Sequence, residues 1–385
     1  MKIGIFTNNY LPNPYGVSGS IESFRKQFES RGHEVFIFAP RWKGYEDENP
    51  NVFRYPSVDI EIKIKFPLAI PYSKKMDKII SELDLDIIHS QHPNLLGSTA
   101  KKWARKKNIP LVFTWHTLYD QYVHFFPFLP AGISSWWTIR NARSYANRAD
   151  AVIAPTPTAE KIIRGWGVAN KNVSVIPSGV EEEIFRNPDG ESIRKKYGVQ
   201  EDETCLLVIS RLTQEKNMEF LFKAVTLSLK RNEKIKFLVG GEGYLQEKLK
   251  NYVKESGVER QVIFAGFVSG NAKKDYYAAG DIFVYASKSE TQGMILSEAM
   301  YSGLPLVAVK APGAQDLIED GVNGLLVSES SDEFAAAIEK IIADKKLREK
   351  FSENSKKIGR EKYANTVCAE KMLEVYAEAI QRKNS

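Results

Sequence analysis

Apolar residues gather in short continuous runs along the whole chain, and stretches with helical spacing lie between most of them. Continuous apolar strands, unlike strands that alternate apolar and polar residues, are typical of parallel sheets covered on both faces. The runs therefore predict two doubly wound α/β domains. The first series of strands is Lys2–Thr7, Val35–Ala39, Ile87–Ser90, Leu111–Thr114 and Ala151–Ala154. The second series is Cys205–Ser210, Lys236–Val239, Val262–Ala265, Ile282–Tyr285 and Leu306–Val309.

A polar, turn-rich segment separates the two series. Pro177-Ser178-Gly179 predicts a turn, and a run of glutamates follows it. We place the join at Val175–Asn187, which gives an N-terminal domain over residues 1–180 and a C-terminal domain over residues 181–362. The end of the chain is helical in pattern, and we expect its last helix, about 363–385, to pack back on the first domain. Two such domains that face each other form a central cleft, and ligands bind beyond the carboxyl ends of the strands.

Composition narrows the class of protein. The chain has 385 residues, which suits two or three domains of roughly 100–200 residues each. Hydrophobic residues make up 43% and charged residues 26%, which argues against disorder. The apolar runs are too short to span a membrane, and the chain opens on a strand pattern instead of a secretory signal, so we expect a cytosolic protein. Two cysteines argue against a disulfide framework or a cysteine-based zinc site, and a net charge of +6 is too small to indicate nucleic acid as a partner.

The loop after the first strand, Asn8–Ser20, is rich in glycine and proline. Gly16 and Gly19 permit close approach of the backbone, and the N-terminus of the predicted helix Ile21–Arg31 offers N–H groups to a phosphate. The other interpretation is a flexible turn in which Ser20 caps the helix. These residues alone favour neither. Their spacing is not a dinucleotide fingerprint, which argues against a nicotinamide enzyme.

Histidines follow two strands of the first series. His116 comes soon after Leu111–Thr114, where it can face a cleft and bond a substrate hydroxyl, although a lone histidine is more often structural. His89 and His92 present the same choice. The three are not spaced as a metal-ligand cluster. The carboxylates of the Asp84-Leu85-Asp86 run lie before a strand, at the wrong end of the sheet for a site, so we predict no metal.

Two cations follow the first strand of the second domain. Arg211 and Lys216 lie across a turn that enters a helix, and two cations beside a helix N-terminus would bind a diphosphate. Taken alone, two solvated charges are the better interpretation. Gly240–Gly243 follows the next strand and permits close backbone approach to a ligand, which alone is a weak signal.

Two glutamates lie on a later loop and on the helix that it opens. From Glu290 to Glu298, a helix advances about 12 Å and its turn angle returns to within about 80° of the start, so both carboxylates can face one elongated ligand. Gln292, Gly293 and Met294 would present backbone N–H groups at the helix start. Cations and a helix end suit a diphosphate, whereas carboxylates suit sugar hydroxyls. Together the loops predict a nucleotide-sugar site that needs no metal.

With these motifs in order on the expected loops, the chain resembles the retaining glycosyltransferases of family 4, which have the two-domain GT-B architecture. Glu290 and Glu298 match the family's E-x7-E motif in SETQGMILSEAMYSGLPLVA, and Arg211 and Lys216 match its diphosphate-binding pair. Within the family, the N-terminal segments YLPNPYGVSGSIESF and SQHPNLLGSTAKKWARKKNIPLVFTWHTLYDQYVHFFPFLP are similar to those of bacterial diacylglycerol glucosyltransferases. Two departures concern the acceptor side: Gly19 stands where many relatives carry Thr or Ala, and Asp120 where they often carry Glu.

The resemblance implies transfer of glucose from UDP-glucose to 1,2-diacylglycerol with retention, without a metal or other cofactor and without a protein nucleophile. The leaving diphosphate would itself take the acceptor proton. Glu290 would hold the sugar 3- and 4-hydroxyls, Glu298 the ribose hydroxyls, and His116 the sugar 6-hydroxyl or nearby backbone. The implied catalytic residues are His116, Arg211, Lys216 and Glu290. The implied donor contacts are Gly16, Val17, Gly241, Glu242, Val268, Gln292, Gly293, Met294, Ile295 and Glu298.

Aromatic residues crowd the segment from Trp115 to Trp137, and arginines follow it. Trp and Phe beside Arg is typical of a helix that lies in a membrane interface. Lysine clusters at 74–78 and 101–107 would add attraction to anionic headgroups. We therefore expect a peripheral contact with the inner face of the cell membrane; the other interpretation is that these aromatics fill the core. The predicted acceptor and membrane residues are Tyr119, Asp120, Tyr122, Trp136, Trp137, Arg140 and Arg143.

Other functions stay open at this point. A family 4 transferase with another donor sugar or a soluble acceptor is the nearest alternative, and exposure or burial of the aromatic segment would separate the two. A sugar-binding protein without catalysis belongs to a different class, and hydrolysis of a nucleotide sugar would exclude it. The expected partners are thus a nucleotide sugar, diacylglycerol or a related lipid, and an anionic membrane surface, with no nucleic acid.

Overall fold

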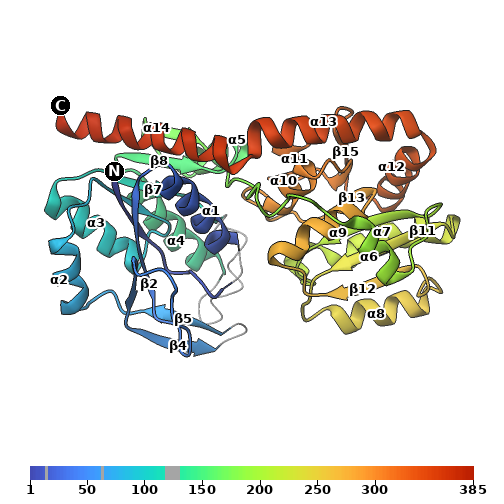
Figure 1. Cartoon of the computed structure of the whole chain (residues 1–385), viewed down its shortest axis with the longest axis horizontal. Helices are drawn as coiled ribbons and strands as arrows, with labels where there is room; N and C mark the ends of the chain where they lie inside the picture. The colour runs from blue at the N-terminus through green and yellow to red at the C-terminus, as the bar shows by residue number, and fades with distance from the viewer. Residues whose placement is uncertain (14–15, 62–64, 118–130) are drawn as a thin grey trace. The chain divides into compact units, whose positions relative to one another are not determined.

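The computed structural model describes residues 1–13, 16–61, 65–117 and 131–385, which form two compact units (Figure 1). Unit 1 comprises Met1–Gly179 and Asn365–Ser385, and unit 2 comprises Val180–Ala364. The first passage of the chain between the units falls within the segment where the sequence places the join. The chain passes back to unit 1 between Ala364 and Asn365, so the last helix belongs to unit 1.

A seven-stranded sheet of parallel pairs forms the centre of unit 1, in the order β3-β2-β1-β6-β7-β8-β9. The strands are β1 (Lys2–Phe6), β2 (Glu34–Pro40), β3 (Val52–Tyr55), β6 (Ile87–Ser90), β7 (Leu111–Thr114), β8 (Ala151–Ala154) and β9 (Val173–Val175). The helices are α1 (Gly16–Ser30), α2 (Lys74–Glu82), α3 (Leu96–Lys107), α4 (Ala131–Ala146) and α5 (Pro157–Gly165). A separate antiparallel ribbon is formed by β4 (Ser57–Glu61) and β5 (Lys65–Ala69).

The continuous apolar pattern arises because both faces of this sheet are covered. Successive side chains of a strand point to opposite faces. Phe6 and Phe38 are buried in the core of one face, and their neighbours Ile5 and Ile37 are buried in the core of the other. The order of the strands reverses between β1 and β6, which is the position where doubly wound sheets bind ligands.

Helix α14 (Asn365–Asn384), drawn in red, completes unit 1 by covering the Ile5 face beside α1 (Figure 1). Cys368, Met372 and Tyr376 are buried there, and the Tyr376 ring lies 5.6 Å from that of Phe28 on α1. The helix thus belongs to the core of this unit.

A six-stranded sheet of parallel pairs forms the centre of unit 2, in the order β12-β11-β10-β13-β14-β15. The strands are β10 (Thr204–Ile209), β11 (Ile235–Gly240), β12 (Val262–Gly266), β13 (Ile282–Tyr285), β14 (Leu306–Val309) and β15 (Gly324–Val327). The α-helices are α6 (Gly190–Tyr197), α7 (Met218–Arg231), α8 (Gln246–Glu255), α9 (Lys273–Ala279), α10 (Met294–Tyr301), α11 (Ala314–Leu317), α12 (Ser331–Ala343) and α13 (Lys345–Tyr363), with short 3-10 turns η2 (Gln214–Lys216) and η3 (Gly270–Ala272). The order reverses between β10 and β13.

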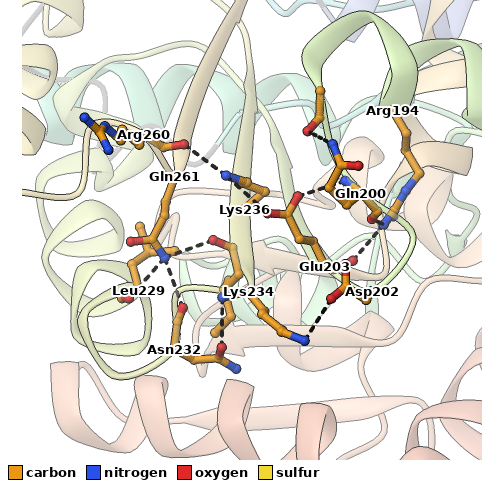
Figure 2. A network of polar contacts seen from close by, with 12 residues as sticks. Arg194, Gln200, Asp202, Glu203, Leu229, Asn232, Lys234, Lys236, Arg260 and Gln261 are labelled. Atoms are coloured by element: carbon orange, nitrogen blue, oxygen red, sulfur yellow. Dashed lines mark hydrogen bonds and ion pairs between the residues drawn. The ribbon is translucent and has the colours of Figure 1, made fainter.

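Polar bonds fasten the amino ends of these strands, as Figure 2 shows. The Gln261 amide donates to three backbone carbonyls, those of Leu229, Asn232 and Ile235, at 3.0–3.1 Å. Lys236 pairs with Glu203 at 3.3 Å. These side chains are engaged in holding the sheet, so chemistry in unit 2 is to be sought at the opposite, carboxyl end.

The predicted fold class is confirmed, because every strand of the two predicted series occurs in its sheet. The predicted helix Ile21–Arg31 was placed one turn too late, since α1 begins at Gly16. Ser20 therefore lies inside α1, and its interpretation as the N-cap is wrong; its hydroxyl lies 2.8 Å from that of Ser178. In the described ranges, no helix combines the length and the apolar character needed to cross a bilayer.

Candidate active site

Unit 2 brings its candidate residues together at the point where the strand order reverses. β10 and β13 are neighbours in the sheet, so the loops that leave their carboxyl ends lie side by side. The hydroxyl of Ser289 donates to the carbonyl oxygen of Glu215 at 3.1 Å, and Ser287 Oγ lies 3.3 Å from the same oxygen. The loop that carries both predicted cations is thus fastened to the loop that carries Glu290.

Glu290 receives its donors on one oxygen. Lys216 Nζ, the Tyr285 hydroxyl at 2.6 Å and the Ser287 hydroxyl at 2.8 Å all bond Oε1. In the parts of the chain that the structure describes, no side chain or backbone donor bonds Oε2. Burial works to raise the pKa of Glu290, but the charge of Lys216 and these donated bonds outweigh it and lower the pKa to about 2. The carboxylate is therefore ionised at neutral pH, with one oxygen held and the other available to a ligand.

The two predicted cations differ in how firmly they are held. The Lys216 side chain is 13% exposed and forms its ion pair with Glu290. The Arg211 side chain is 31% exposed, and its guanidinium lies 3.4 Å from the carboxylate of Glu215, which is in η2. Both cations lie beside an acidic group of their own unit, and Arg211 is the one with more access to solvent. A diphosphate that approaches this edge of the sheet would meet both positive charges.

Glu298 lies about one turn into α10 and is held by a second helix. Lys273 Nζ is 2.7 Å from Oε1, and the Tyr277 hydroxyl donates to Oε2 at 2.8 Å. Both donors come from α9 and are separated by one helical turn, so they lie on the same helical face. Burial and the neighbouring carboxylate raise the pKa of Tyr277 well above its usual value, which keeps its hydroxyl a donor.

The segment between the two glutamates makes a sharp entry into α10. Gly293 has φ +81 and precedes the first residue of the helix, Met294. Met294 and Ile295 are half-buried, and the first N–H groups of any helix lack partners within it. Gln292 is buried, with its side chain 3.3 Å from the Ser297 hydroxyl. The predicted backbone contacts thus lie at a helix start, while the Gln292 side chain points into the unit.

The glycine-rich loop after β11 packs on the loop that carries Arg211. A Cβ on Gly241 would lie 1.8 Å from the carbonyl oxygen of Ser210, and one on Gly243 would lie 2.3 Å from that of Leu212. The carbonyl of Glu242 accepts from the Leu212 amide at 2.9 Å, and the Glu242 side chain is exposed. Close packing of the two loops therefore accounts for these glycines without a ligand.

The loop after β12 exposes one apolar side chain and buries the next. Gly266 has φ +74 and turns the chain, Phe267 is 57% exposed, and Val268 is buried. A Cβ on Gly240 would lie 3.1 Å from the Val268 side chain. Any contact of Val268 with a nucleotide must therefore come from its backbone.

The polar groups at the carboxyl edge of unit 1 are neutral. His116 Nε2 lies 2.6 Å from the Gln91 amide oxygen, which assigns the proton to that nitrogen. His89 is buried between the Tyr376 hydroxyl of α14, at 2.6 Å, and the Thr114 hydroxyl, at 2.7 Å. Burial lowers the pKa of each of the two histidines to about 3. His89 is thus fully engaged in the structure, whereas His116 is half-buried at the strand end.

His92 is also structural. Its Nδ1 accepts the backbone N–H of Asn8 at 3.1 Å, and burial lowers its pKa to about 4. The Asp86 carboxylate accepts the backbone N–H of Lys2 at 2.6 Å. In the described ranges, no group of three His, Cys, Asp or Glu side chains is placed to hold a metal.

A small enclosed cavity lies beside His116 within unit 1. The cavity volume open to the centre of a water molecule is about 10 Å³, which leaves room for roughly one water molecule. Its polar lining comes from Ser20, His89, Gln91, Thr114, His116, Ser178 and Tyr376. The cavity is too small for a sugar ring, so His116 can meet a substrate only at its outer edge.

The first loop enters α1 directly. Gly16 is the first residue of the helix and is exposed, and Val17 is half-buried. A Cβ on Gly19 would meet no atom within 4 Å, so the Ala or Thr of the family pattern would fit there. The departure at Gly19 is therefore not required by packing in this chain.

The aromatic segment divides between core and surface. Trp115 is buried, and its indole donates to the Thr117 carbonyl at 2.7 Å, so the core interpretation holds for it. On α4, Trp136 and Trp137 are 61% and 58% exposed, and the Arg140 guanidinium lies 5.4 Å from the Trp136 ring centre. Arg143 is half-buried. The predicted residues Tyr119, Asp120 and Tyr122 lie outside the residues that the structure describes.

Some residues of the lysine clusters form bonds within unit 1, and others are exposed. On α3, Lys102 pairs with Asp77 of α2 at 3.1 Å, and Lys107 donates to the Leu83 carbonyl at 2.8 Å. The side chains of Lys74, Lys75, Lys78, Arg105 and Lys106 are exposed. Unit 1 therefore carries both exposed tryptophans and exposed cations.

Two family profiles divide the chain between them. "Glycosyltransferase Family 4" matches residues 14–184, and "Glycosyl transferases group 1" matches residues 189–358. The alpha-monoglucosyldiacylglycerol synthase of Streptococcus pneumoniae is 32% identical over 100% of this chain and 87% of its own length. The chain is a family 4 glycosyltransferase.

Further comparisons support the assignment of this chain to the family 4 glycosyltransferases. The alpha-monoglucosyldiacylglycerol synthase of Acholeplasma laidlawii is 27% identical over 100% of this chain and 98% of its own length. The crystal structure of Anabaena Alr3699/HepE in complex with UDP and glucose has a TM-score of 0.77 at 21% identity, and covers 98% of this chain and 100% of that chain. The two units are the Rossmann-like domains of the GT-B architecture.

In this glycosyltransferase, the structure joins Lys216 to Glu290, two residues predicted from the sequence. It also adds three side chains that the sequence analysis missed, namely Lys273, Tyr277 and Tyr285. The two tyrosines lie in apolar segments and would be read as core. Lys273 stands beside Lys274 at a helix start, and only the packing of α9 on α10 distinguishes the two.

Proposed function

We propose that this glycosyltransferase moves glucose from UDP-glucose to the free hydroxyl of 1,2-diacylglycerol, with retention, at the inner face of the cell membrane. The full-length similarity to two alpha-monoglucosyldiacylglycerol synthases supports the lipid acceptor. The observation that carries the proposal is the pairing of Lys216 with Glu290, a cation beside a carboxylate where the strand order of unit 2 reverses.

The site suits the two ends of a sugar diphosphate. Arg211 and Lys216 would face the diphosphate. In many enzymes, hydrogen-bond donors and charges directed at the charge that develops in the transition state contribute most of the rate enhancement. Oε2 of Glu290 would accept the 3- and 4-hydroxyls of glucose, because Oε1 already has three donors. The amides of Gln292 to Ile295 would add N–H groups at the start of α10. The positive charge comes from side chains, so we propose transfer without a metal or other cofactor.

The transfer needs one bond broken and one formed at the anomeric carbon. The bond to the leaving diphosphate oxygen breaks while the lipid hydroxyl oxygen attacks from the same face. The hydroxyl proton passes to the diphosphate, so UDP itself serves as the base. His116 would bond the sugar 6-hydroxyl as a neutral imidazole, since its lowered pKa leaves it uncharged at pH 7. Gly16 and Val17 would close over the phosphates.

Unit 1 carries the features that a membrane contact requires. Trp136 and Trp137 are exposed on α4 beside Arg140, which suits insertion at the headgroup level. The exposed lysines of α2 would be attracted to anionic lipid by about 1 kcal/mol each near the surface. We therefore propose peripheral binding through this unit.

The test is product formation in mixed micelles. Purified protein is incubated with UDP-glucose, diacylglycerol and increasing phosphatidylglycerol, and the lipid fraction is examined for glucosyl-diacylglycerol by mass spectrometry and for its anomeric configuration by NMR. We expect an α-linked product that increases with anionic lipid, persists in EDTA, and is lost in Glu290→Gln but not in Glu255→Gln, an exposed glutamate of the same unit.

Other outcomes would revise separate parts of the proposal. Release of UDP without a lipid product would keep the donor and reject the acceptor. Turnover of UDP-galactose or GDP-mannose in preference to UDP-glucose would reject the donor sugar. A β-linked product would reject retention, and loss of activity in EDTA would reject the metal-free mechanism.

A further inference from the structure

Glu298 is held in a different way from Glu290. Lys273 bonds its Oε1 and Tyr277 bonds its Oε2, so each oxygen has one donor. The side chain of Glu298 is 11% exposed and that of Lys273 is 26% exposed, whereas Tyr277 is fully buried. Two donors from α9 thus hold the carboxylate, which remains partly accessible to solvent.

The number of acceptor positions limits what such a carboxylate can bind. An ionised carboxylate offers about four lone-pair positions, two on each oxygen. Lys273 and Tyr277 fill one position on each oxygen, which leaves one on each. The two remaining acceptor positions, one on each oxygen of the carboxylate, can accept from two hydroxyls on adjacent carbons, such as the 2′- and 3′-hydroxyls of a ribose. Glu290 differs, because all three of its donors bond Oε1.

We propose that Lys273 and Tyr277 are positioning residues that hold Glu298 with one lone pair on each oxygen directed at a vicinal diol, and that this arrangement makes the site select ribonucleotides over 2′-deoxyribonucleotides. The inference rests on the proposed function, which supplies the nucleoside diphosphate. It concerns two residues outside the motif that identified the site.

The charge of Lys273 is essential to this arrangement. Without it, Oε1 of Glu298 would lose its donor and its ion-pair partner, and the carboxylate would be free to turn about its bond to the chain. The i, i+4 spacing of Lys273 and Tyr277 places both donors on one face of α9, so neither can be moved independently of the helix.

A purely structural role makes a different prediction. If the ion pair only fastens α9 to α10, its loss lowers the melting temperature and weakens all nucleotides by the same factor. If it positions Glu298, its loss weakens UDP, which bonds Glu298 through two hydroxyls, more than 2′-deoxy-UDP, which has only the 3′-hydroxyl. The ratio of two affinities therefore distinguishes the roles even where a variant is less stable.

The experiment measures the Kd of UDP and of 2′-deoxy-UDP by calorimetry on the full-length protein. The variants are Lys273→Met, Lys273→Arg, Tyr277→Phe and, as the matched control, Lys274→Met. Lys274 is the adjacent lysine, and it bonds the Asn187 carbonyl at 2.6 Å instead of Glu298. Melting temperatures are recorded for each variant.

We expect the unaltered protein to prefer UDP by on the order of tenfold, because a site built to bond a hydroxyl rejects the analogue that lacks it. Lys273→Met should weaken UDP more than 2′-deoxy-UDP, which can bond Glu298 only through its 3′-hydroxyl, so the preference for UDP falls severalfold. Tyr277→Phe should reduce the preference in part. Lys273→Arg should restore it, and Lys274→Met should keep it.

An unchanged preference in Lys273→Met, whatever its melting temperature, would overturn the inference and leave the proposed function in place. Equal binding of UDP and 2′-deoxy-UDP by the unaltered protein would do the same. No binding of UDP to the unaltered protein would overturn the proposed function, together with the inference that rests on it.

Discussion

The two units share a sheet topology but carry different chemistry at the same edge. In each, the strand order begins 3-2-1 and then reverses, and the candidate residues follow strands near the reversal. In unit 2 these residues are charged, with Lys216 on Glu290 and Lys273 on Glu298. In unit 1 they are neutral, with His116 on Gln91 and His89 between two hydroxyls.

Electrostatics explains the difference. Burial lowers the pKa of His116 to about 3, so it stays uncharged. Glu290 is also buried, yet its pKa falls to about 2 because Lys216 compensates for the burial. A site for a diphosphate needs fixed charge, and each buried charge then needs a partner. A site for hydroxyl groups can be built without charge. One fold thus presents two kinds of chemistry through the residues at its strand ends.

The largest effect should come from breaking the charged site. Lys216→Met removes a cation from the diphosphate and leaves Glu290 ionised without its partner. Because either loss alone is costly, we expect kcat/KM for glucosyl transfer to fall by on the order of 1,000-fold. The Kd of UDP should rise as well. Lys223→Met, an exposed lysine of the same unit, is the control and should retain activity. A fall of less than tenfold in Lys216→Met would contradict the assignment.

Much of this fold follows from the sequence, and its omissions share one cause. Nine of the ten predicted strands lie inside the two sheets, where continuous apolar runs are needed, and β12 is the one predicted at an edge. The missed parallel strands β3, β9 and β15 are all edge strands. β9 reads Val-Ser-Val and is half-buried throughout, and β3 contains an arginine. An edge strand has less apolar area to bury, so its pattern is weaker.

The candidate site was predictable on the loops after strands and at the start of the helix that one of these loops opens. Glu290 and Lys216 lie there, and the sheet topology brings them together. Lys273 and Tyr277 reach Glu298 through the packing of α9 on α10, which no local pattern encodes. Of two adjacent lysines, Lys273 bonds Glu298 and Lys274 bonds a backbone carbonyl. The same limit applies to Trp115 and Trp136, which belong to one aromatic segment of the sequence but differ in burial.

The neutral site should show a smaller and narrower effect. His116→Ala removes one hydrogen bond to the sugar, and we expect kcat/KM to fall by about 10- to 100-fold. The Kd of UDP should not change, because UDP lacks the glucose. Measuring both constants for His116→Ala and Lys216→Met sharpens the comparison, since only the second variant should affect UDP. Weakened UDP binding in His116→Ala would show that the units do not divide the work in this way.

Acid should separate the units by stability. His89 has its pKa lowered to about 3, so below pH 6.5 the unfolded chain binds a proton that the native unit does not. Stability from His89 is therefore lost as the pH falls from 6.5 toward 3, by about 2 kcal/mol between pH 7 and pH 5. Glu290, whose pKa falls from 4.5 to about 2, loses its contribution only below about pH 4.5. Unit 1 should weaken first.

The six tryptophans make this measurable, because all of them lie between residues 42 and 166 in unit 1. Urea unfolding followed by tryptophan fluorescence at pH 7 and pH 5 reports that unit. The variant His89→Gln keeps hydrogen-bonding capacity without titrating, and its stability should depend less on pH by about 2 kcal/mol. Identical pH dependence in the variant and the unaltered protein would rule out this role for His89.

The smallest effect should come from the surface of unit 1. Trp136 and Trp137 are mostly exposed, so replacing both with Ala should change the free energy of unfolding by less than about 1 kcal/mol. Binding to vesicles that contain phosphatidylglycerol should weaken severalfold, because the tryptophans no longer enter the headgroup region. Release of UDP from UDP-glucose in detergent solution should stay unchanged. Co-sedimentation with vesicles measures the first effect, and Trp166→Phe, a residue packed against Trp115 in the core, is the control. Vesicle binding that survives the double substitution would move the membrane contact away from α4 and toward the lysines of α2 and α3.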